Sequence, residues 1–237
     1  MRVGCIGYGT IGQRVVLGLA APPVAVLVRR PRGERDINFV YSVDELVSAD
    51  PEVVIEAASP DALAQYALPI VSSGRTLIAA SGAGLRNDAL RSRLIEEGRR
   101  TGGSVVLAAG ALAGLDALAA AAVGGLERVR LQITDPNPEQ PPFDGSGWDG
   151  VRRYPARLNV AAAAALAAGR DIELTVRNGP RHELRLEASG DFGELSATLR
   201  LAPEQDHIVA LSLLETLQRL AGPGHLVIHR QTGSAPG

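Results

Sequence analysis

Three glycines in the order GxGxxG, placed directly after the first apolar segment, constrain the fold of this chain more than any other feature. The segment Val3 to Ile6 predicts a strand, and the glycines follow it at once. In this order the first glycine permits a tight strand-to-helix turn, the second lets backbone amides approach a pyrophosphate, and the third lets the helix close onto the strand. The phosphates would lie at the positive N-terminus of that helix. The motif offers these residues as contacts: Gly7, Gly9, Thr10, Ile11 and Gly12.

The alternative is that these glycines only pack a turn, because glycine is common here, at 27 of 237 residues. Their position after a strand favours the dinucleotide site. A net charge of −2 and an aromatic content of 3% argue against binding to nucleic acid. The chain starts without a leader pattern and has no apolar segment suited to span a bilayer, so we expect a cytoplasmic protein without membrane contacts. The single cysteine, Cys5, is expected to be a buried packing residue.

Strand and helix patterns alternate through the first 110 residues. Further buried strands are expected at 24–28, 53–58, 76–80 and 104–108, and helices at 13–20, 61–72 and 87–100. This alternation predicts an α/β fold in which residues 1–110 form a doubly wound parallel sheet, the Rossmann arrangement. Ser42 and Glu45 have the spacing of a capping box, and the pair Ser59-Pro60 is typical of a helix start.

The ends of the second strand and of the strand at 53–58 supply the other candidate contacts with the dinucleotide. In the Rossmann pattern an acidic residue at the end of the second strand binds the ribose hydroxyls, but here Arg29 and Arg30 occupy that place, with Arg32 close behind. Arginines there suit the 2′-phosphate of NADP. A solvated basic loop explains them equally well, so NADP is favoured and NAD stays open. At the end of the other strand the candidate contacts are Ala58, Ser59 and Pro60.

Residues 111–230 predict a mixed α+β domain, followed by a tail at 231–237. The segment 135–150 is rich in proline, glycine and aspartate, and we expect a mobile loop or a lid there. Asn159 is expected to cap an alanine-rich helix. Strands are expected at 129–134, 172–177, 182–188, 194–201 and 225–229, and a last helix over 206–221. The strands at 172–177, 182–188 and 194–201 are joined by short turns, which favours antiparallel pairing.

Several segments, spread over nearly the whole chain, resemble the short L-aspartate dehydrogenases that have an N-terminal Rossmann domain. They are the glycine motif, EAASPDA at 56–62, GALAGLDAL at 110–118, LNVAA at 158–162 and the strand that bears His182. The alanine-rich segments are more specific than the glycines. The resemblance implies oxidation of L-aspartate to iminosuccinate with NAD or NADP; the imine hydrolyses to oxaloacetate and ammonia or feeds nicotinamide biosynthesis. We also expect a homodimer formed through the second domain.

By the same resemblance, Ala111 and Asn159 correspond to contacts on the nicotinamide side, and His182 to the catalytic histidine. Hydride transfer from Cα requires a neutral amine and therefore a base with a pKa near neutrality, which suits histidine. His182 could instead activate the water that attacks the imine. Without the resemblance, a lone histidine at a strand start is typically a surface or packing residue. His225 and His229 share a strand face, but two ligands are too few for a metal, and we expect none.

Three segments depart from the family pattern. An Ala-Asp-Pro loop is replaced by the residues at 176–180, a Lys-Pro pair by Asp135-Pro136, and a Pro-Lys-Thr-Ser segment by one that contains Glu204. Two basic residues thus become acidic, and an acid that faces the substrate would weaken binding of a dicarboxylate. The chain offers Arg153, Arg157, Arg177 and Arg181 as replacement cations. Another amino or imino acid as substrate, or a non-catalytic NAD(P)-binding sensor, are the alternatives.

Overall fold

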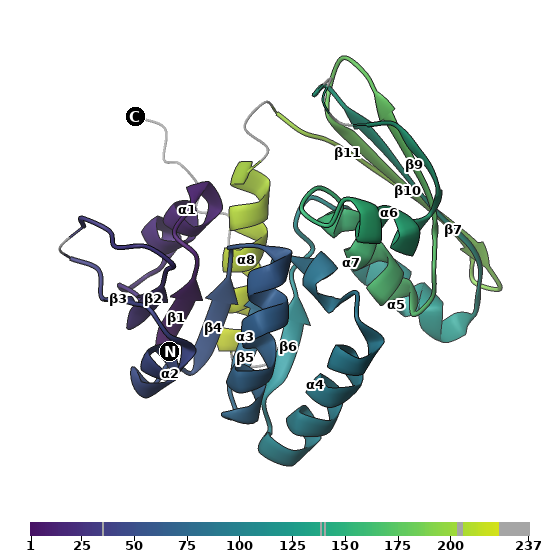
Figure 1. Ribbon diagram of the computed structural model, residues 1–237. Coiled ribbons are helices and arrows are strands. Elements are labelled where there is room, and N and C mark those ends of the chain that lie inside the picture. The colour runs from purple at the N-terminus through teal and green to yellow at the C-terminus, as the bar shows by residue number, and fades with distance from the viewer. Residues whose placement is uncertain (35, 138, 140, 203–205, 223–237) are drawn as a thin grey trace, which may run out of the picture.

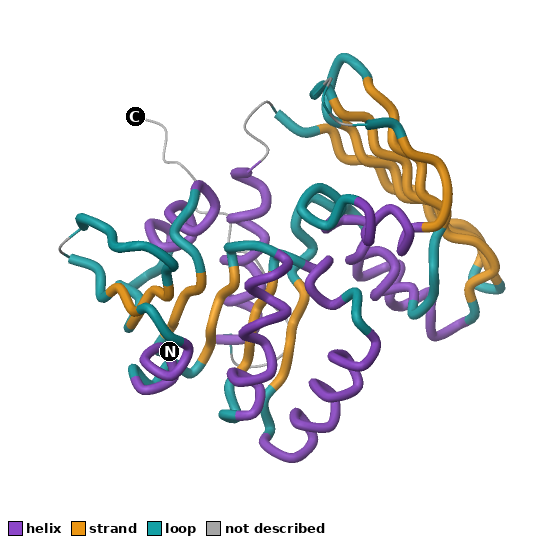
Figure 2. The backbone as a smooth tube through the Cα atoms, in the orientation of Figure 1, coloured by secondary structure: helices purple, strands orange, loops and turns teal. Residues whose placement is uncertain are grey.

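The computed structural model describes residues 1–34, 36–137, 139, 141–202 and 206–222, and it contains two sheets (Figure 1). One sheet is covered by helices on both faces. The other has helices on one face and is open on the other. Figure 2 shows the two sheets, each with its helices, as two bodies side by side. Helices lie between the strands of the second sheet and the first body.

The first sheet has six parallel strands in the order β3-β2-β1-β4-β5-β6. Its strands are β1 Val3–Ile6, β2 Ala25–Leu27, β3 Phe39–Val40, β4 Val53–Glu56, β5 Thr76–Ala79 and β6 Ser104–Leu107. The helices that follow them are α1 Thr10–Gly18, α2 Val43–Ser48, α3 Pro60–Ser72, the short 3₁₀ helix η1 Gly82–Leu85 and α4 Asp88–Thr101. This arrangement confirms the Rossmann prediction. The strand order changes direction between β1 and β4, where α/β proteins bind their ligands.

The predicted helix starts are confirmed by their caps. The Ser42 hydroxyl accepts a hydrogen bond from the Glu45 amide, and the Glu45 carboxylate accepts one from the Ser42 amide, which completes a capping box. The Ser59 hydroxyl accepts from the Ala62 amide, with Pro60 in the first helical position. Cys5 is buried in β1, and this burial raises the pKa of its thiol to about 12.

The last helix, α8 Asp206–Ala221, returns to the first sheet (Figure 1). Its buried side chains Ala210, Leu213 and Leu217 share one core with residues of β1, β4 and β5. Helices α2, α3 and α4 cover the opposite face. The helix also meets α1 closely, because a Cβ on Gly18 would lie 2.4 Å from Cδ1 of Leu214. A helix far along the sequence thus completes the core of the first 110 residues.

The second sheet has the order β11-β10-β7-β9-β8. Its strands are β7 Leu126–Asp135, β8 Phe143–Ser146, β9 Glu173–Asn178, β10 Glu183–Gly190 and β11 Gly193–Arg200. Helices α5 Leu115–Gly124, α6 Gly147–Arg153 and α7 Asn159–Ala168 cover one face. Five consecutive alanines of α7 are buried, and their small side chains let this helix pack closely. The prediction of a mixed α+β arrangement after the first sheet is confirmed.

The expected antiparallel order of the three later strands is wrong in part. Strands β10 and β11 form an antiparallel hairpin, but β9 pairs in parallel with β7 and does not pair with β10. The ten-residue strand β7 lies between them and bonds both. Sequence pattern identifies strands by their alternation, but the partner of each strand depends on contacts far along the chain.

The segment 135–150 was expected to be a mobile loop or a lid, and that expectation is wrong for its second half. Residues 143–153 form β8 and α6. The Asp171 carboxylate accepts hydrogen bonds from the Ser146 hydroxyl at 2.5 Å and from the Trp148 amide at 3.0 Å. A Cβ on Gly150 would lie 2.6 Å from Leu174, so glycine serves close packing here. The expected strand at 225–229, the tail at 231–237 and Glu204 lie outside the described residues.

Within the described ranges, no helix has both the length and the apolar character needed to cross a membrane.

Candidate cofactor cleft and catalytic histidine

The glycine turn between β1 and α1 has the geometry that the motif predicts. Gly7 has a φ of +92°, and a Cβ there would lie 2.7 Å from the Ala57 carbonyl oxygen. A Cβ on Gly12 would lie 2.4 Å from the Gly7 carbonyl oxygen. A Cβ on Gly9 would meet nothing within 4 Å, so this glycine faces open space. Gly9 is also the N-cap of α1 and gives it no side-chain hydrogen bond, which leaves the first amides of the helix for an anion.

A cleft of about 450 Å³ opens beside this turn, at the carboxyl ends of β1, β2 and β4. Its volume is in the range of small-molecule and cofactor sites. The predicted contacts that line it are Gly7, Gly9, Arg29, Arg30, Ala58 and Ser59. Thr10, Ile11 and Gly12 follow in the first turn of α1, and Pro60 is the first residue of α3. The loops after β1, β2 and β4, which are far apart in the sequence, thus meet at one cleft.

The basic residues after β2 form one wall of this cleft. Arg29, Arg30 and Arg32 all line it. The guanidinium of Arg32 lies 5.9 Å from the centre of the Tyr8 ring, and Tyr8 contacts Phe39 edge to face. The wall therefore offers cations and an aromatic ring, which together suit the phosphorylated adenosine end of a dinucleotide.

A buried glutamate, which the sequence analysis did not assign to the site, bonds the backbone of two residues that line the cleft. Glu56 ends β4 and is fully buried. Its carboxylate accepts hydrogen bonds from the amides of Ala58 at 2.8 Å and Ser59 at 3.0 Å, and from the amide and hydroxyl of Ser81 at 3.0 and 2.9 Å. Burial raises the pKa of Glu56, while the hydrogen bonds, foremost that from Ala58, oppose this shift. Glu56 is an acid inside an apolar run, which is the signal that could have identified it.

Asn159 and Ala111 lie at the same edge of the first sheet, next to β5 and β6. The expectation that Asn159 caps α7 is wrong, because Leu158 occupies the cap position and makes no side-chain bond. Instead, the Asn159 side-chain oxygen accepts a hydrogen bond of 3.1 Å from the amide of Ala83 in η1. Ala111 is buried in the turn that follows β6. The Asn159 side chain thus joins the start of α7 to the first sheet, although neither residue is among those that line the cleft.

His182 precedes β10 and is held between two neighbouring strands. Its carbonyl oxygen accepts a hydrogen bond from the Leu201 amide at 2.9 Å. Its Nδ1 lies 3.9 Å from Oδ1 of Asp135, the last residue of β7, with the two side chains 16% and 20% exposed. Burial lowers the pKa of His182, and the charge of Asp135 opposes part of that shift. The imidazole is therefore neutral at pH 7, the form a general base requires.

The structure brings the predicted contacts from the loops after β1, β2 and β4 to one cleft, but it does not bring Ala111 and Asn159 there. Among the described residues, no contact or pocket joins His182 to the cleft. Asp135, one of the two acidic departures, lies beside the histidine. Of the candidate replacement cations, Arg177 bonds the Asp144 carboxylate at 2.8 Å and Arg153 lies over the Tyr154 ring. In the part of the chain that the structure describes, no group of three or more His, Cys, Asp or Glu side chains is arranged to hold a metal ion.

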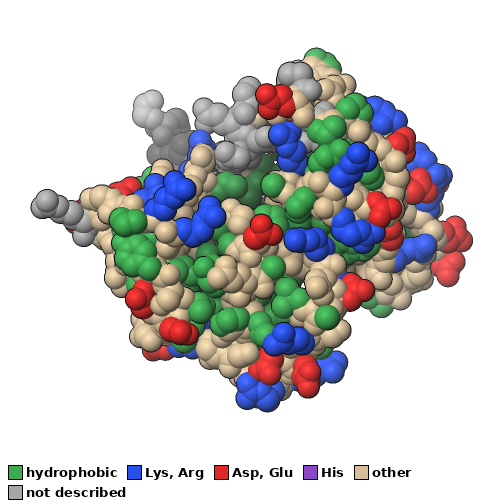
Figure 3. Space-filling model, in the orientation of Figure 1, with side chains coloured by type: hydrophobic (Ala, Val, Ile, Leu, Met, Phe, Trp, Pro, Cys, Tyr) green, Lys and Arg blue, Asp and Glu red, His purple; other side chains and the backbone are tan. Residues whose placement is uncertain are grey.

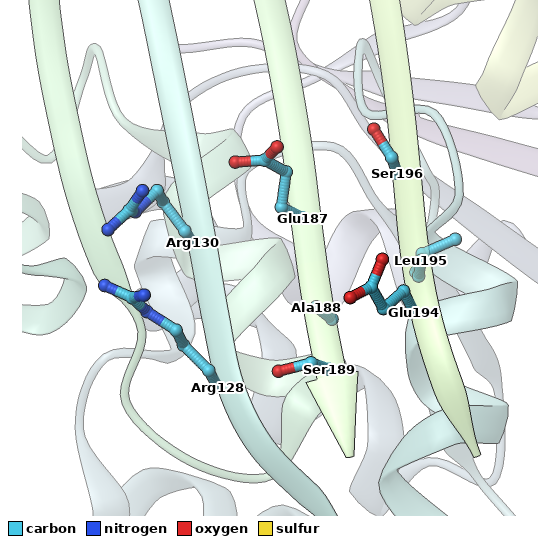
Figure 4. A pocket seen from close by; sticks show the side chains of 8 residues that line it. All are labelled: Arg128, Arg130, Glu187, Ala188, Ser189, Glu194, Leu195 and Ser196. Carbon is cyan, nitrogen blue, oxygen red and sulfur yellow. The ribbon is translucent and has the colours of Figure 1, made fainter. Parts of the chain in front are cut away.

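The open face of the second sheet carries a shallow concavity of about 210 Å³, away from the glycine turn. Figure 4 shows Arg128 and Arg130 of β7 and Glu187 of β10 on this face. Both arginines form ion pairs with Glu173 of β9, at 2.8 and 3.2 Å. Figure 3 shows charged side chains of both signs spread over this part of the molecule. Such a surface is polar and paired, and it lacks the apolar lining typical of a small-molecule site.

Comparisons with known proteins place both halves of the chain. Residues 7–108 match the family model described as homoserine dehydrogenase, NAD binding domain, and residues 135–220 match aspartate dehydrogenase, C-terminal. The L-aspartate dehydrogenase of Archaeoglobus fulgidus is 32% identical over 233 residues, which cover 93% of this chain and 98% of that protein. L-aspartate dehydrogenase 1 of Bordetella parapertussis is 33% identical, with 96% and 98% covered. The crystal structure of aspartate dehydrogenase from Thermotoga maritima is 22% identical and superposes with a TM-score of 0.79, covering 94% of this chain and 97% of that one.

Proposed function

This chain belongs to the L-aspartate dehydrogenase family, and from that premise we propose that it oxidises L-aspartate to iminosuccinate with NAD or NADP. The imine then hydrolyses to oxaloacetate and ammonia. The observation that carries the proposal is the similarity to named L-aspartate dehydrogenases over nearly the full length of both proteins. The glycine turn and the cleft beside it support the cofactor, because Gly9 leaves open space where the pyrophosphate would approach.

The residues assigned to the cofactor divide into three groups. Gly7, Gly9, Thr10, Ile11 and Gly12 at the N-terminus of α1 would hold the pyrophosphate. Arg29 and Arg30 would hold the adenosine end, and the remaining proposed contacts are Ala58, Ser59, Pro60, Ala111 and Asn159. When bound at this edge, the nicotinamide would supply the hydride acceptor for Cα of the amino acid. The chain's own contribution would be to hold the two reactants in position, which supplies a large part of the rate enhancement in such reactions.

His182 is the proposed general base. Its neutral imidazole takes a proton from the ammonium of the substrate, so that the nitrogen lone pair can assist the loss of hydride from Cα. Burial keeps the imidazole neutral at pH 7. In the reverse direction, once hydride has added to Cα, the imidazolium returns this proton to the amine nitrogen.

The proposed function is tested by measuring NADPH and NADH oxidation with oxaloacetate plus ammonia, next to a panel of other 2-oxo acids. We expect turnover confined to oxaloacetate. Turnover with another 2-oxo acid instead would assign a different amino or imino acid to this enzyme. Tight NADPH binding without turnover on any member of the panel would indicate a diverged relative with another substrate or a non-catalytic sensor.

The arginines after β2 lead us to propose a preference for NADP over NAD. Replacing both Arg29 and Arg30 with serine should raise the Kd for NADPH by about 100-fold or more, because each charge-assisted hydrogen bond to the 2′-phosphate contributes about 1.5–3 kcal/mol. The Kd for NADH should change little. Fluorescence titration of both nucleotides measures these values, and Arg99→Ser, an exposed position on α4, is the control. Equal loss for both nucleotides, or tighter NADH than NADPH binding by the unaltered protein, would contradict this preference.

We also propose that the protein is a cytoplasmic homodimer. The open face of the second sheet is the candidate interface, since helices cover only the other face of this sheet.

A further inference from the structure

We propose that Asp135 is the positioning residue for His182, with its carboxylate behind Nδ1 so that Nε2 is the atom that takes the substrate proton. The proposal rests on the proposed function, in which His182 is the base. It goes further, because it assigns a role to an acid that the proposed function leaves unused.

The register of the sheet places the two residues opposite each other. Strands β7 and β10 are antiparallel, and Thr134 pairs with Glu183. One step further along the ladder, Asp135 therefore faces His182. Directly opposite residues of an antiparallel pair have Cβ atoms about 4.5–5.5 Å apart, which is within reach of a carboxylate and an imidazole. The pairing is thus built into the backbone of the sheet.

The local contacts fix the carboxylate while they leave the imidazole nitrogen unpaired. The Asn137 amide donates to Oδ1 of Asp135 at 2.9 Å, and the Gly179 amide donates to the Asp135 carbonyl at 3.1 Å. Nδ1 of His182 is buried without a hydrogen-bond partner among the described residues. A buried polar atom without a partner is costly. Catalytic hydrogen bonds are often long in the free enzyme and tighten when substrate binds. The 3.9 Å between Nδ1 of His182 and Oδ1 of Asp135 is consistent with such a bond in the free enzyme.

The charges around the pair leave Asp135 as the group that acts on the imidazole. On β10 and β11, Glu183 is bonded to Arg200 at 2.6 Å. On the β9 side, Arg177 is bonded to Asp144 on β8. The neighbouring Arg181 is exposed. An Asp135 carboxylate behind Nδ1 holds the proton there, selects the tautomer with a free Nε2, and stabilises the imidazolium formed during the reaction.

The position of Asp135 relative to the substrate and the imidazole decides whether its carboxylate affects KM or kcat. A carboxylate that faced the substrate would repel L-aspartate and raise KM. A carboxylate that lies behind the imidazole leaves KM largely unchanged and supports kcat.

The test is Asp135→Asn in the full-length enzyme, assayed for L-aspartate oxidation. We expect kcat to fall about 10- to 100-fold, less than the roughly 10²–10⁴-fold contribution of a general base itself, with KM for L-aspartate within about twofold. Asp135→Glu should restore part of kcat. The control is Asp191→Asn, the same change at the opposite end of the β10–β11 hairpin, which should leave both constants unchanged.

A second readout needs no substrate. The Asp135 charge raises the pKa of His182 against the effect of burial, so its removal in Asp135→Asn should lower the pKa measured by NMR titration of the His182 ring protons. The His182→Gln variant identifies those signals by their loss. The acid limb of kcat/KM should move to lower pH in the same variant.

An Asp135→Asn enzyme with an unchanged His182 pKa, or one that lowers KM while kcat is retained, would overturn the proposal. Failure of the proposed function has a different appearance, because the unaltered enzyme would then not turn over L-aspartate at all. The NMR titration would still show whether the pair exists.

Discussion

Replacing His182 with alanine should lower kcat for L-aspartate oxidation by about 10²–10⁴-fold, the usual contribution of a positioned general base. Binding of NADPH should remain as in the unaltered enzyme, because the glycine turn and the cleft beside it lie on the other sheet. Steady-state rates and a fluorescence titration measure the two quantities. Arg93→Ala, at an exposed position on α4, is the control and should retain full activity.

The pH dependence of the unaltered enzyme gives a second measure of the same residue. A base must be neutral to act, and burial lowers the pKa of His182 below its ordinary value of about 6.5. The profile of kcat/KM should therefore stay level through pH 7 and fall only below about pH 6.5, as the imidazole gains a proton. In His182→Ala this limb should be absent. Unchanged rates in His182→Ala would remove the histidine from the mechanism, and an unchanged acid limb would assign the limb to another group.

Replacing Glu56 with glutamine should reduce both stability and cofactor affinity. The four groups that bond Glu56 are all donors, and a glutamine amide has only one oxygen to accept from them, so its NH₂ must face a donor. Losing the charge and one buried hydrogen bond costs about 2–4 kcal/mol of unfolding free energy. For a chain of this size that lowers Tm by about 5–15 °C.

Cofactor affinity should fall with it, because the Ala58 and Ser59 amides that Glu56 holds belong to the wall of the cleft. We expect a weaker Kd for NADPH with the variant still folded at 20 °C. Scanning calorimetry and nucleotide titration measure the two effects, and Glu96→Gln, at an exposed position on α4, serves for comparison. A variant with normal Tm and normal NADPH binding would show that the hydrogen bonds of Glu56 are not needed for either property.

The features predicted correctly from sequence depend on neighbouring residues. The turn at Gly7 requires a positive φ that glycine adopts readily, and Ser42 and Ser59 bond amides three residues away, so each pattern is contained in a few positions. The same holds for the alternation that predicts the parallel sheet. Arg29 and Arg30 follow from that sheet, because a parallel strand end places them at the ligand edge.

The features that sequence analysis missed depend on contacts between distant segments. Asn159 was interpreted as a local cap, whereas its side chain bonds an amide 76 residues earlier. Asp135 and His182 meet only because β7 and β10 pair in one particular register. Glu56 looked like one polar residue in a strand, and its four donors come from two different loops. No periodicity in a single segment contains such information.

The return of α8 to the first sheet has a consequence for how the protein is made. The nucleotide-binding half is synthesised first, but Ala210, Leu213 and Leu217, which pack on one face of its sheet, are synthesised only after the strands of the second sheet. A nascent chain that ends before residue 206 carries an apolar sheet face without this cover. In the chain, the second sheet lies between β6 and α8. The helix α8 can therefore pack on the first sheet only after the second sheet has been made. Although domains often fold in order of synthesis, the first sheet of this enzyme completes its core only after the second sheet has been synthesised.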